Sequence, residues 1–197
     1  MHNILLVKTN LIFGVICMPS VFLSPSLQEW NPYVNGGSEE YFMNLVADAI
    51  EPYLRASGIT YARNTPSQTL SQAIAQSNEG SYDLHLAIHS NAAGSQNSGT
   101  VRGTDVYYYP TSSKGKRAAE IIAENYRNIY PLPDRVKTVA STSLAELRRT
   151  KAPAVLIETA YHDNLADAEW IQENIGAIGR NLAQSIAQIL GVPFVDL

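Results

Sequence analysis

Two apolar runs, each closed by a residue that can do chemistry, constrain the fold of this chain most strongly. Residues 83–90 form a run that ends at His89 and Ser90, and residues 154–158 form a second run that ends at Glu158. Short apolar runs bounded by turn residues are typical of buried strands. Sites in open α/β sheets form beyond the carboxyl ends of the strands. We therefore expect His89 and Glu158 to meet at one sheet edge.

Helical patterns alternate with further strand-like runs along the rest of the sequence. Besides the two runs above, strands are predicted at residues 20–23, 59–62, 105–109 and 136–139. Helices are predicted at residues 39–57, 70–78, 114–129, 144–149, 164–174 and 178–190. This order predicts an α/β fold: a single domain over residues 19–197 with a mostly parallel twisted sheet and helices on both faces. Pro52 is expected to kink or divide its helix.

Composition excludes several classes of function. Hydrophobic residues make up 45% of the chain and charged residues 16%, which indicates a folded domain. The formal net charge is -4 without a long basic run, so nucleic acid is not an expected partner. Cys17 is the only cysteine, which excludes an intrachain disulfide and a thiolate metal cluster. We interpret it as a packed thiol.

The N-terminal residues 1–18 form an apolar extension or a signal-like segment. Residues 11–18 are apolar and Lys8 precedes them, as in the first two regions of a signal peptide. The stretch is too short to span a bilayer as a helix, so we expect no stable membrane insertion.

His89 is the candidate metal ligand of the first run. Alternation places His85 and His89 on the same strand face, with backbone positions about 13 Å apart. One zinc ion cannot bind both, because Zn–N bonds are about 2 Å long. We therefore interpret His89 as the ligand and His85 as a core or supporting histidine. A purely structural histidine at position 89 remains the alternative.

Charged residues near the predicted edge supply further candidates. Glu40 falls in the first helical turn after Ser38, where the helix dipole favours a carboxylate in any case, and its neighbour Glu39 could take the same role. Arg148 and Arg149 could bind substrate carboxylates through paired hydrogen bonds, or could be a solvated charge pair.

Three motifs in this order resemble one enzyme family. Residues 40–45 look like its Glu-x-x-x-Asn-Leu helix start, residues 87–92 like its Ser-x-His-x-Asn-Ala strand end, and residues 153–158 like its Pro-x-Val-Leu-Val-Glu motif, with Asn164 as the trailing asparagine. The chain is thereby similar, over most of residues 20–191, to the zinc-dependent N-acetylmuramoyl-L-alanine amidases of the third amidase class.

The resemblance implies a cofactor, a reaction and a substrate. Zn²⁺ would be held by two histidines and one glutamate, of which His89 and Glu40 are present. Glu158 would act as general base on water and then as acid toward the leaving amine. The bond cut would join N-acetylmuramic acid to L-alanine in peptidoglycan. Asn91, together with the two arginines, is a candidate substrate contact.

One departure from the family pattern leaves the third ligand open. The family's first ligand is a histidine in a turn after the first strand, where this chain has Leu27. Gln28 is nearest to the vacated position and is our predicted third metal ligand. Glu29 and His162 are the alternatives. Oxygen ligation is acceptable for zinc, although glutamine is an uncommon choice.

Three functions therefore stay open at this point. The first is an active amidase, the second a catalytically silent amidase fold that binds cell wall or a regulatory partner, and the third a zinc-dependent peptidase-like hydrolase. An exported protein would act in the cell wall or outside the cell, whereas one that lacks an export signal would stay in the cytoplasm until lysis or sporulation. Oligomeric state is not indicated by the sequence.

Overall fold

The computed structural model describes residues 18–197. The expectations for Cys17 and for the apolar or signal-like segment lie almost wholly outside these residues. Within residues 18–197, no helix combines the length and the apolar character that a membrane span requires.

Six strands form one sheet, and most of them run parallel. The strands are β1 (Ser20–Pro25), β2 (Thr60–Arg63), β3 (Leu84–Asn91), β4 (Thr104–Tyr108), β5 (Val136–Ala140) and β6 (Ala154–Tyr161). Their order across the sheet is β2-β1-β3-β6-β4-β5. Only the β4–β6 pair is antiparallel, so β4 and β5 run against the other four strands. The predicted α/β class and mostly parallel sheet are confirmed.

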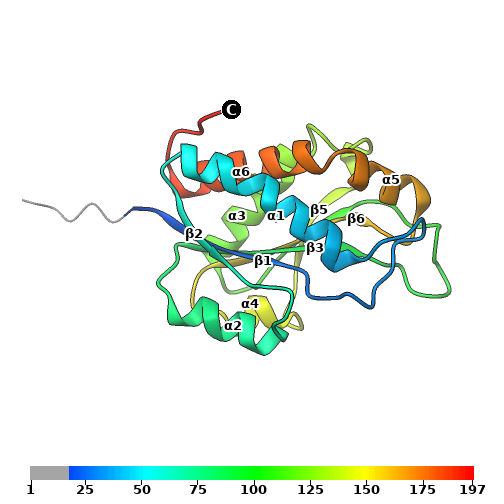
Figure 1. Cartoon of the computed structure of the whole chain (residues 1–197), viewed down its shortest axis with the longest axis horizontal. Coiled ribbons are helices and arrows are strands. Elements are labelled where there is room, and N and C mark those ends of the chain that lie inside the picture. Colours follow the sequence, from blue (N-terminus) through cyan, green and yellow to red (C-terminus); the bar gives the residue numbers. More distant parts are fainter. Residues whose placement is uncertain (1–17) are drawn as a thin grey trace, which may run out of the picture.

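Helices cover both faces of this sheet (Figure 1). They are α1 (Glu39–Ala56), α2 (Leu70–Glu79), α3 (Ser113–Tyr126), α4 (Ala145–Arg149), α5 (Leu165–Glu173) and α6 (Ile175–Leu190), with one short 3-10 turn, η1 (Pro133–Arg135). In Figure 1, α1, α5 and α6 lie above the sheet and α2 and α4 lie below it. The lower layer is the thinner one, and it leaves room at the sheet edge.

Alternation along β3 assigns its side chains to the two layers. Leu86 and Ile88 point into the large core beneath α1 and α6. Ala87 belongs to a smaller apolar cluster with Leu147 of α4 and Leu156 of β6. His85 and His89 share the face of Ala87, because side chains of a strand alternate with a period of two. Both histidines therefore face the thinner layer, and they share one strand face as the sequence predicts.

Strands β3 and β6 extend further than their apolar runs indicate. The prediction that Glu158 ends its strand is wrong, because β6 continues to Tyr161. A register shift between His89 and Asn91 lets the pairing resume, with Asn91 opposite Tyr161. His89 and Glu158 are direct neighbours across the two strands. The extension keeps both side chains on rigid, hydrogen-bonded backbone.

Helix α1 begins and ends where local chemistry predicts. The Ser38 side chain accepts a hydrogen bond from the Tyr41 amide, which caps the helix start. Gly58 follows the helix end with φ of 70°, a conformation that glycine adopts without strain. Pro52 does not divide the helix. The carbonyl that loses its partner belongs to Asp48, which is exposed to water.

Candidate metal and catalytic site

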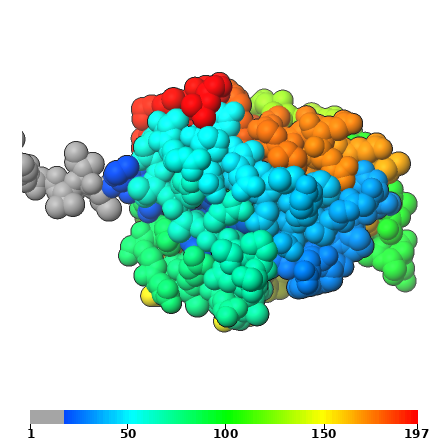
Figure 2. Space-filling model, in the orientation of Figure 1, coloured from blue at the N-terminus to red at the C-terminus, as the bar shows by residue number. Residues whose placement is uncertain are grey.

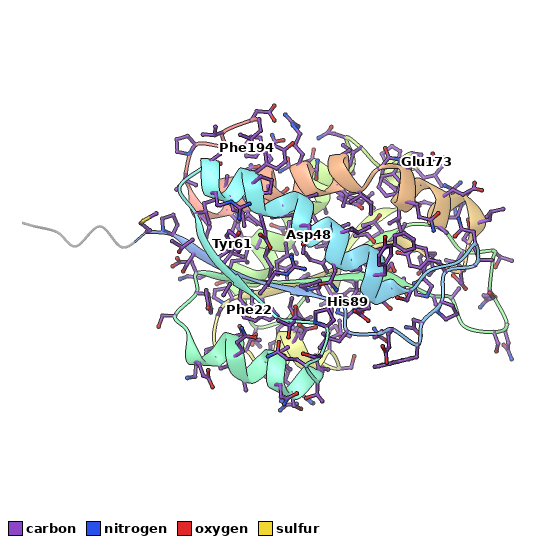
Figure 3. The ribbon with its side chains drawn as sticks, in the orientation of Figure 1. Phe22, Asp48, Tyr61, His89, Glu173 and Phe194 are labelled. Carbon is purple, nitrogen blue, oxygen red and sulfur yellow. The ribbon has the colours of Figure 1, made fainter. Side chains whose placement is uncertain are left out.

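The site lies at the carboxyl edge of β1, β3 and β6, on the side of α2 and α4. Figure 3 shows His89 just below the first turn of α1, where the helix reaches over the sheet edge. Glu39 comes from that first turn, and Gln28 comes from the loop after β1. Glu158 comes from β6, beside His89. Three separate regions of the sequence thus deliver one cluster of polar side chains, because the loop after β1 leads directly into α1.

His89 is held between two carboxylates. Its Nδ1 lies 2.8 Å from Oε1 of Glu39, and its Nε2 lies 3.3 Å from Oε2 of Glu146. The amide Nε2 of Gln28 lies 3.3 Å from the same Glu39 oxygen and 3.4 Å from Nδ1 of His89. Asn31 donates to Oε2 of Glu39 at 3.0 Å. Oε1 of Glu39, Nδ1 of His89 and Nε2 of Gln28 therefore lie close together.

Glu146 joins His89 to a buried polar chain that sequence reasoning missed. Its Oε1 lies 3.1 Å from Nε2 of His85 and also accepts from the Ser24 hydroxyl. Nδ1 of His85 lies 2.9 Å from the Ser77 hydroxyl. Both imidazoles contact the Glu146 carboxylate. This placement fits the interpretation of His85 as a core or supporting histidine. The sequence signal for Glu146 was weak, because it is one glutamate in a five-residue helix.

Burial and charge separate the protonation behaviour of the three acidic groups. Burial raises the pKa of Glu158 to about 7, and the charge of His89 opposes this only in part. Burial also disfavours the charged form of Glu39, but contact with His89 outweighs it and lowers its pKa. Contacts with His85 and His89 outweigh burial at Glu146 and hold its pKa well below the usual range. Only Glu158 is poised to gain and lose a proton near neutral pH.

A cavity of about 700 Å³ opens over this cluster. Its lining includes His89, Glu146 and Glu158 together with residues 24–30 of β1 and the loop after it. Among the described residues, Oε2 of Glu158 is buried and has no hydrogen-bond partner. Leaving a buried carboxylate oxygen unpaired costs free energy, so a ligand, water or proton is the expected partner.

The structure brings Glu39, and not Glu40, to His89. Within residues 18–197, the Glu40 carboxylate makes no hydrogen bond to the site, and its backbone carbonyl accepts from Asn44. One residue along a helix is a rotation of about 100°, so two adjacent glutamates cannot face the same point. Glu39 was the alternative that the residues themselves left open.

Of the other predicted site residues, some line the cavity and others do not. Gln28 and Glu29 line it, and Glu29 is exposed. His162 is buried and contacts the Ser90 hydroxyl at 3.0 Å, away from the cavity lining. Asn91 folds its side chain back onto the Ala92 amide.

Arg148 and Arg149 are exposed and do not line the cavity. Both sit at the end of α4, whose Glu146 faces inward instead. The solvated charge pair, which was the alternative interpretation, fits this placement.

The cluster contains two side chains of metal-binding types. Within the described residues, no group of three or more His, Cys, Asp or Glu side chains has a metal-binding arrangement. Glu39 and His89 are in contact, and the Gln28 atom at the same point is its amide nitrogen Nε2, which does not bind metals. Three protein donors with space for water are the usual number at catalytic zinc sites.

The fold and these side chains define an α/β domain with a cluster of carboxylates and histidines at the carboxyl edge of its sheet. Its sequence belongs to the N-acetylmuramoyl-L-alanine amidase family (Amidase_3), whose family model matches residues 27–190. The match covers α1 to α6 and includes Gln28, Glu39, His89, Glu146 and Glu158, whereas Ser24 precedes it.

Two curated relatives agree with this assignment. The chain is 30% identical over 149 residues to N-acetylmuramoyl-L-alanine amidase LytC of Bacillus subtilis (strain 168), covering 72% of this chain and 29% of LytC. It is 29% identical over 142 residues to CwlM of Bacillus licheniformis, covering 71% of this chain and 53% of CwlM. The chain thus spans about half of one relative and less than a third of the other.

The catalytic domain of CwlV from Bacillus (Paenibacillus) polymyxa var. colistinus has the same fold. Its TM-score is 0.77 at 19% identity, with 89% of this chain and 100% of that chain covered. Cwp6 from Clostridium difficile gives 0.76 at 22% identity, covering 88% of this chain and 30% of Cwp6.

Proposed function

We propose that this chain is a metal-dependent N-acetylmuramoyl-L-alanine amidase that hydrolyses the amide between N-acetylmuramic acid and L-alanine in peptidoglycan. The observation that carries the proposal is the buried, unpaired oxygen of Glu158 in the cavity beside His89. The pKa of Glu158 is about 7 and the residue lines the cavity, and both properties suit a general base. Membership of the amidase family supports the choice of bond, and it favours action at the cell wall.

Glu39, His89 and Gln28 are the residues that we propose to hold a zinc ion. Glu39 takes the role that the resemblance gave to Glu40. Gln28 would present its amide oxygen after a half-turn of the amide, at the expense of its 2.9 Å bond from Asn31. When bound, zinc polarises the scissile carbonyl and makes water acidic enough to lose a proton near neutral pH.

Glu158 moves the protons in the proposed reaction. Its carboxylate takes a proton from the attacking water and then gives it to the nitrogen of the leaving L-alanine. A pKa of about 7 suits both roles, because the group is neither too weak as a base nor too weak as an acid at neutral pH.

Glu146 orients the metal-binding imidazole. Its contact with Nε2 of His89 fixes the ring orientation and leaves Nδ1 facing Glu39 and Gln28. Carboxylate partners of metal-binding histidines have this function in many sites, where they also increase the basicity of the ligand. The bonds from Ser24 and His85 hold Glu146 in place.

Digestion of purified peptidoglycan sacculi tests the proposal directly. We expect the full chain with zinc to release stem peptides that carry a new N-terminal L-alanine, leaving glycan strands intact. A chelator should abolish release, and added zinc should restore it, because the cation supplies several kcal/mol of transition-state stabilisation. Mass spectrometry of the products identifies the bond.

Two other outcomes would overturn the proposal. Cleavage of plain peptides at a similar rate to muropeptides would indicate a peptidase-like hydrolase. Sacculus binding without cleavage at any zinc concentration would indicate a silent amidase fold, which the absence of a histidine at Leu27 makes worth testing.

The adjacent glutamates of α1 form a matched pair for testing the ligand set. Glu39→Gln is expected to weaken zinc binding at least about 100-fold, since losing only a supporting partner of a ligand costs about 10–100-fold. Glu40→Gln should bind zinc as the unmodified chain does. Competition with a fluorescent zinc chelator measures both affinities. If Glu40→Gln showed the larger loss, the assignment of Glu39 would be wrong.

A further inference from the structure

The lining of the cavity beside Glu158 includes an exposed tryptophan. Trp30 is 70% exposed and lines the same cavity as the catalytic groups. Exposed large apolar side chains are common singly, so exposure alone assigns nothing. Trp30, however, shares the cavity rim with Leu70, which is 44% exposed, and with Pro66. Clustered apolar surface with a polar border marks a binding site far more often than scattered residues do.

The loop that carries Trp30 is tied to the proposed metal ligands. The Asn31 amide donates to the Gln28 carbonyl at 3.2 Å, which closes a turn with Trp30 in it. The Asn31 side chain contacts Gln28 at 2.9 Å and Glu39 at 3.0 Å. The indole therefore sits on a turn whose two ends touch the reacting centre. A ligand group stacked on the indole would be held in register with the scissile bond.

The start of α2 also lines the cavity. Ser67, Gln68 and Thr69 contribute residues with hydroxyl and amide groups. Figure 2 shows the blue surface of the loop after β1 meeting the teal surface of the α2 region along the lower part of the molecule. The cavity thus combines an aromatic face with neutral polar groups.

Charge decides which part of the substrate the lining around Trp30 suits. Among the described residues that line the cavity there is no lysine or arginine, whereas Glu29, Glu146 and Glu158 are all acidic. A stem peptide carries carboxylates, and the lining residues around Trp30 and α2 offer these no lysine or arginine. A sugar ring is neutral, has apolar C–H faces that suit an indole, and has hydroxyl and acetamido groups that suit the polar groups at the start of α2.

We infer that Trp30 and the start of α2 form a glycan subsite that stacks the N-acetylmuramic acid ring, or its neighbouring hexosamine, against the indole. The inference rests on the proposed function for the identity of the substrate. It assigns the sugar to the part of the cavity lined by Trp30 and the start of α2. The stem peptide would then lie on the other side of the scissile amide.

Binding to two matched ligands tests the subsite without requiring catalysis. In a Glu158→Gln background, calorimetry would compare a disaccharide–tripeptide with a lactoyl–tripeptide, which keeps the scissile amide but lacks the sugar rings. We expect the sugar rings to raise affinity about tenfold or more, and we expect Trp30→Ala to remove most of that gain while leaving lactoyl–tripeptide affinity unchanged. Trp30→Phe should retain most of the gain, and Tyr41→Ala, an exposed aromatic outside the cavity, should retain all of it.

Three results would overturn the subsite. The first is no gain in affinity from the sugar rings, and the second is an equal gain in the Trp30→Ala protein. The third is that Trp30→Ala weakens binding of both ligands equally, which would place the peptide on Trp30. A protein that binds the disaccharide ligand through Trp30 but leaves sacculi uncut would refute the proposed function and keep the subsite. A protein that cuts sacculi, and whose sugar gain is independent of Trp30, would do the reverse.

Discussion

Replacing Glu158 by glutamine is expected to lower kcat for muropeptide hydrolysis about 10³-fold while zinc stays bound. A positioned general acid–base group contributes roughly 10²–10⁴-fold to a rate, and glutamine keeps the shape of the side chain without its basicity. Glu158 is not among the proposed ligands, so metal analysis of the purified variant should give the same zinc content as the unmodified chain. Rates follow from chromatographic release of stem peptide.

Glu29 offers a matched control for this experiment. Its carboxylate lines the same cavity but is exposed, and no role in proton transfer is assigned to it. Glu29→Gln should hydrolyse muropeptides at close to the unmodified rate. Normal turnover by Glu158→Gln, or an equal loss in both variants, would show that the base has been assigned wrongly.

Replacing Asp167 by alanine is expected to lower the free energy of unfolding by about 3 kcal/mol. Asp167 is fully buried at the start of α5 and accepts from Arg102 Nε at 2.7 Å and from the Tyr130 hydroxyl at 2.8 Å. It also accepts from the backbone amides of Gly103 and Tyr161, each at 3.2 Å. Alanine would leave these donors unpaired, and each unpaired buried group costs about 1–3 kcal/mol.

Urea unfolding monitored by circular dichroism measures this loss. Asp48→Ala is the control, because Asp48 is an exposed partner of Arg63, which keeps its second contact with Glu51 at 2.8 Å. Exposed ion pairs contribute about 0–1 kcal/mol, so the control should change stability little. Equal stability of the two variants would mean that the Asp167 contacts do not anchor α5 to the sheet.

Much of the fold could be predicted from local patterns. The apolar runs around His89 and Glu158 defined two central strands, and Ser38 and Gly58 bounded α1 through capping chemistry alone. The predicted strand end at Glu158 was wrong, because pairing of Tyr161 with Asn91 extends β6 beyond the apolar run. That pairing depends on a neighbouring strand, which a sequence window does not contain.

The arrangement of the site, like the fold, depends partly on local sequence patterns and partly on long-range contacts. Strand alternation placed His85 and His89 on one face, and the strand ends predicted that His89 and Glu158 would meet at one sheet edge. The choice between Glu39 and Glu40 depends on how α1 is rotated about its axis when it packs on the sheet. Glu146 reaches His89 across 57 positions of sequence, so only packing of α4 beneath β3 brings them together.

The sequence by itself therefore determined the alternation of elements and the edge where the site forms. It also supplied His89 and Glu158, for which we propose the roles of metal ligand and base. These features follow from hydrophobic period and residue chemistry, which act over a few residues. Tertiary structure alone decided which glutamate meets His89, that Gln28 shares its position, that Glu146 supports the ring, and that Trp30 lines the same cavity. Each of these contacts joins separate elements, and its geometry is set when their apolar faces pack together.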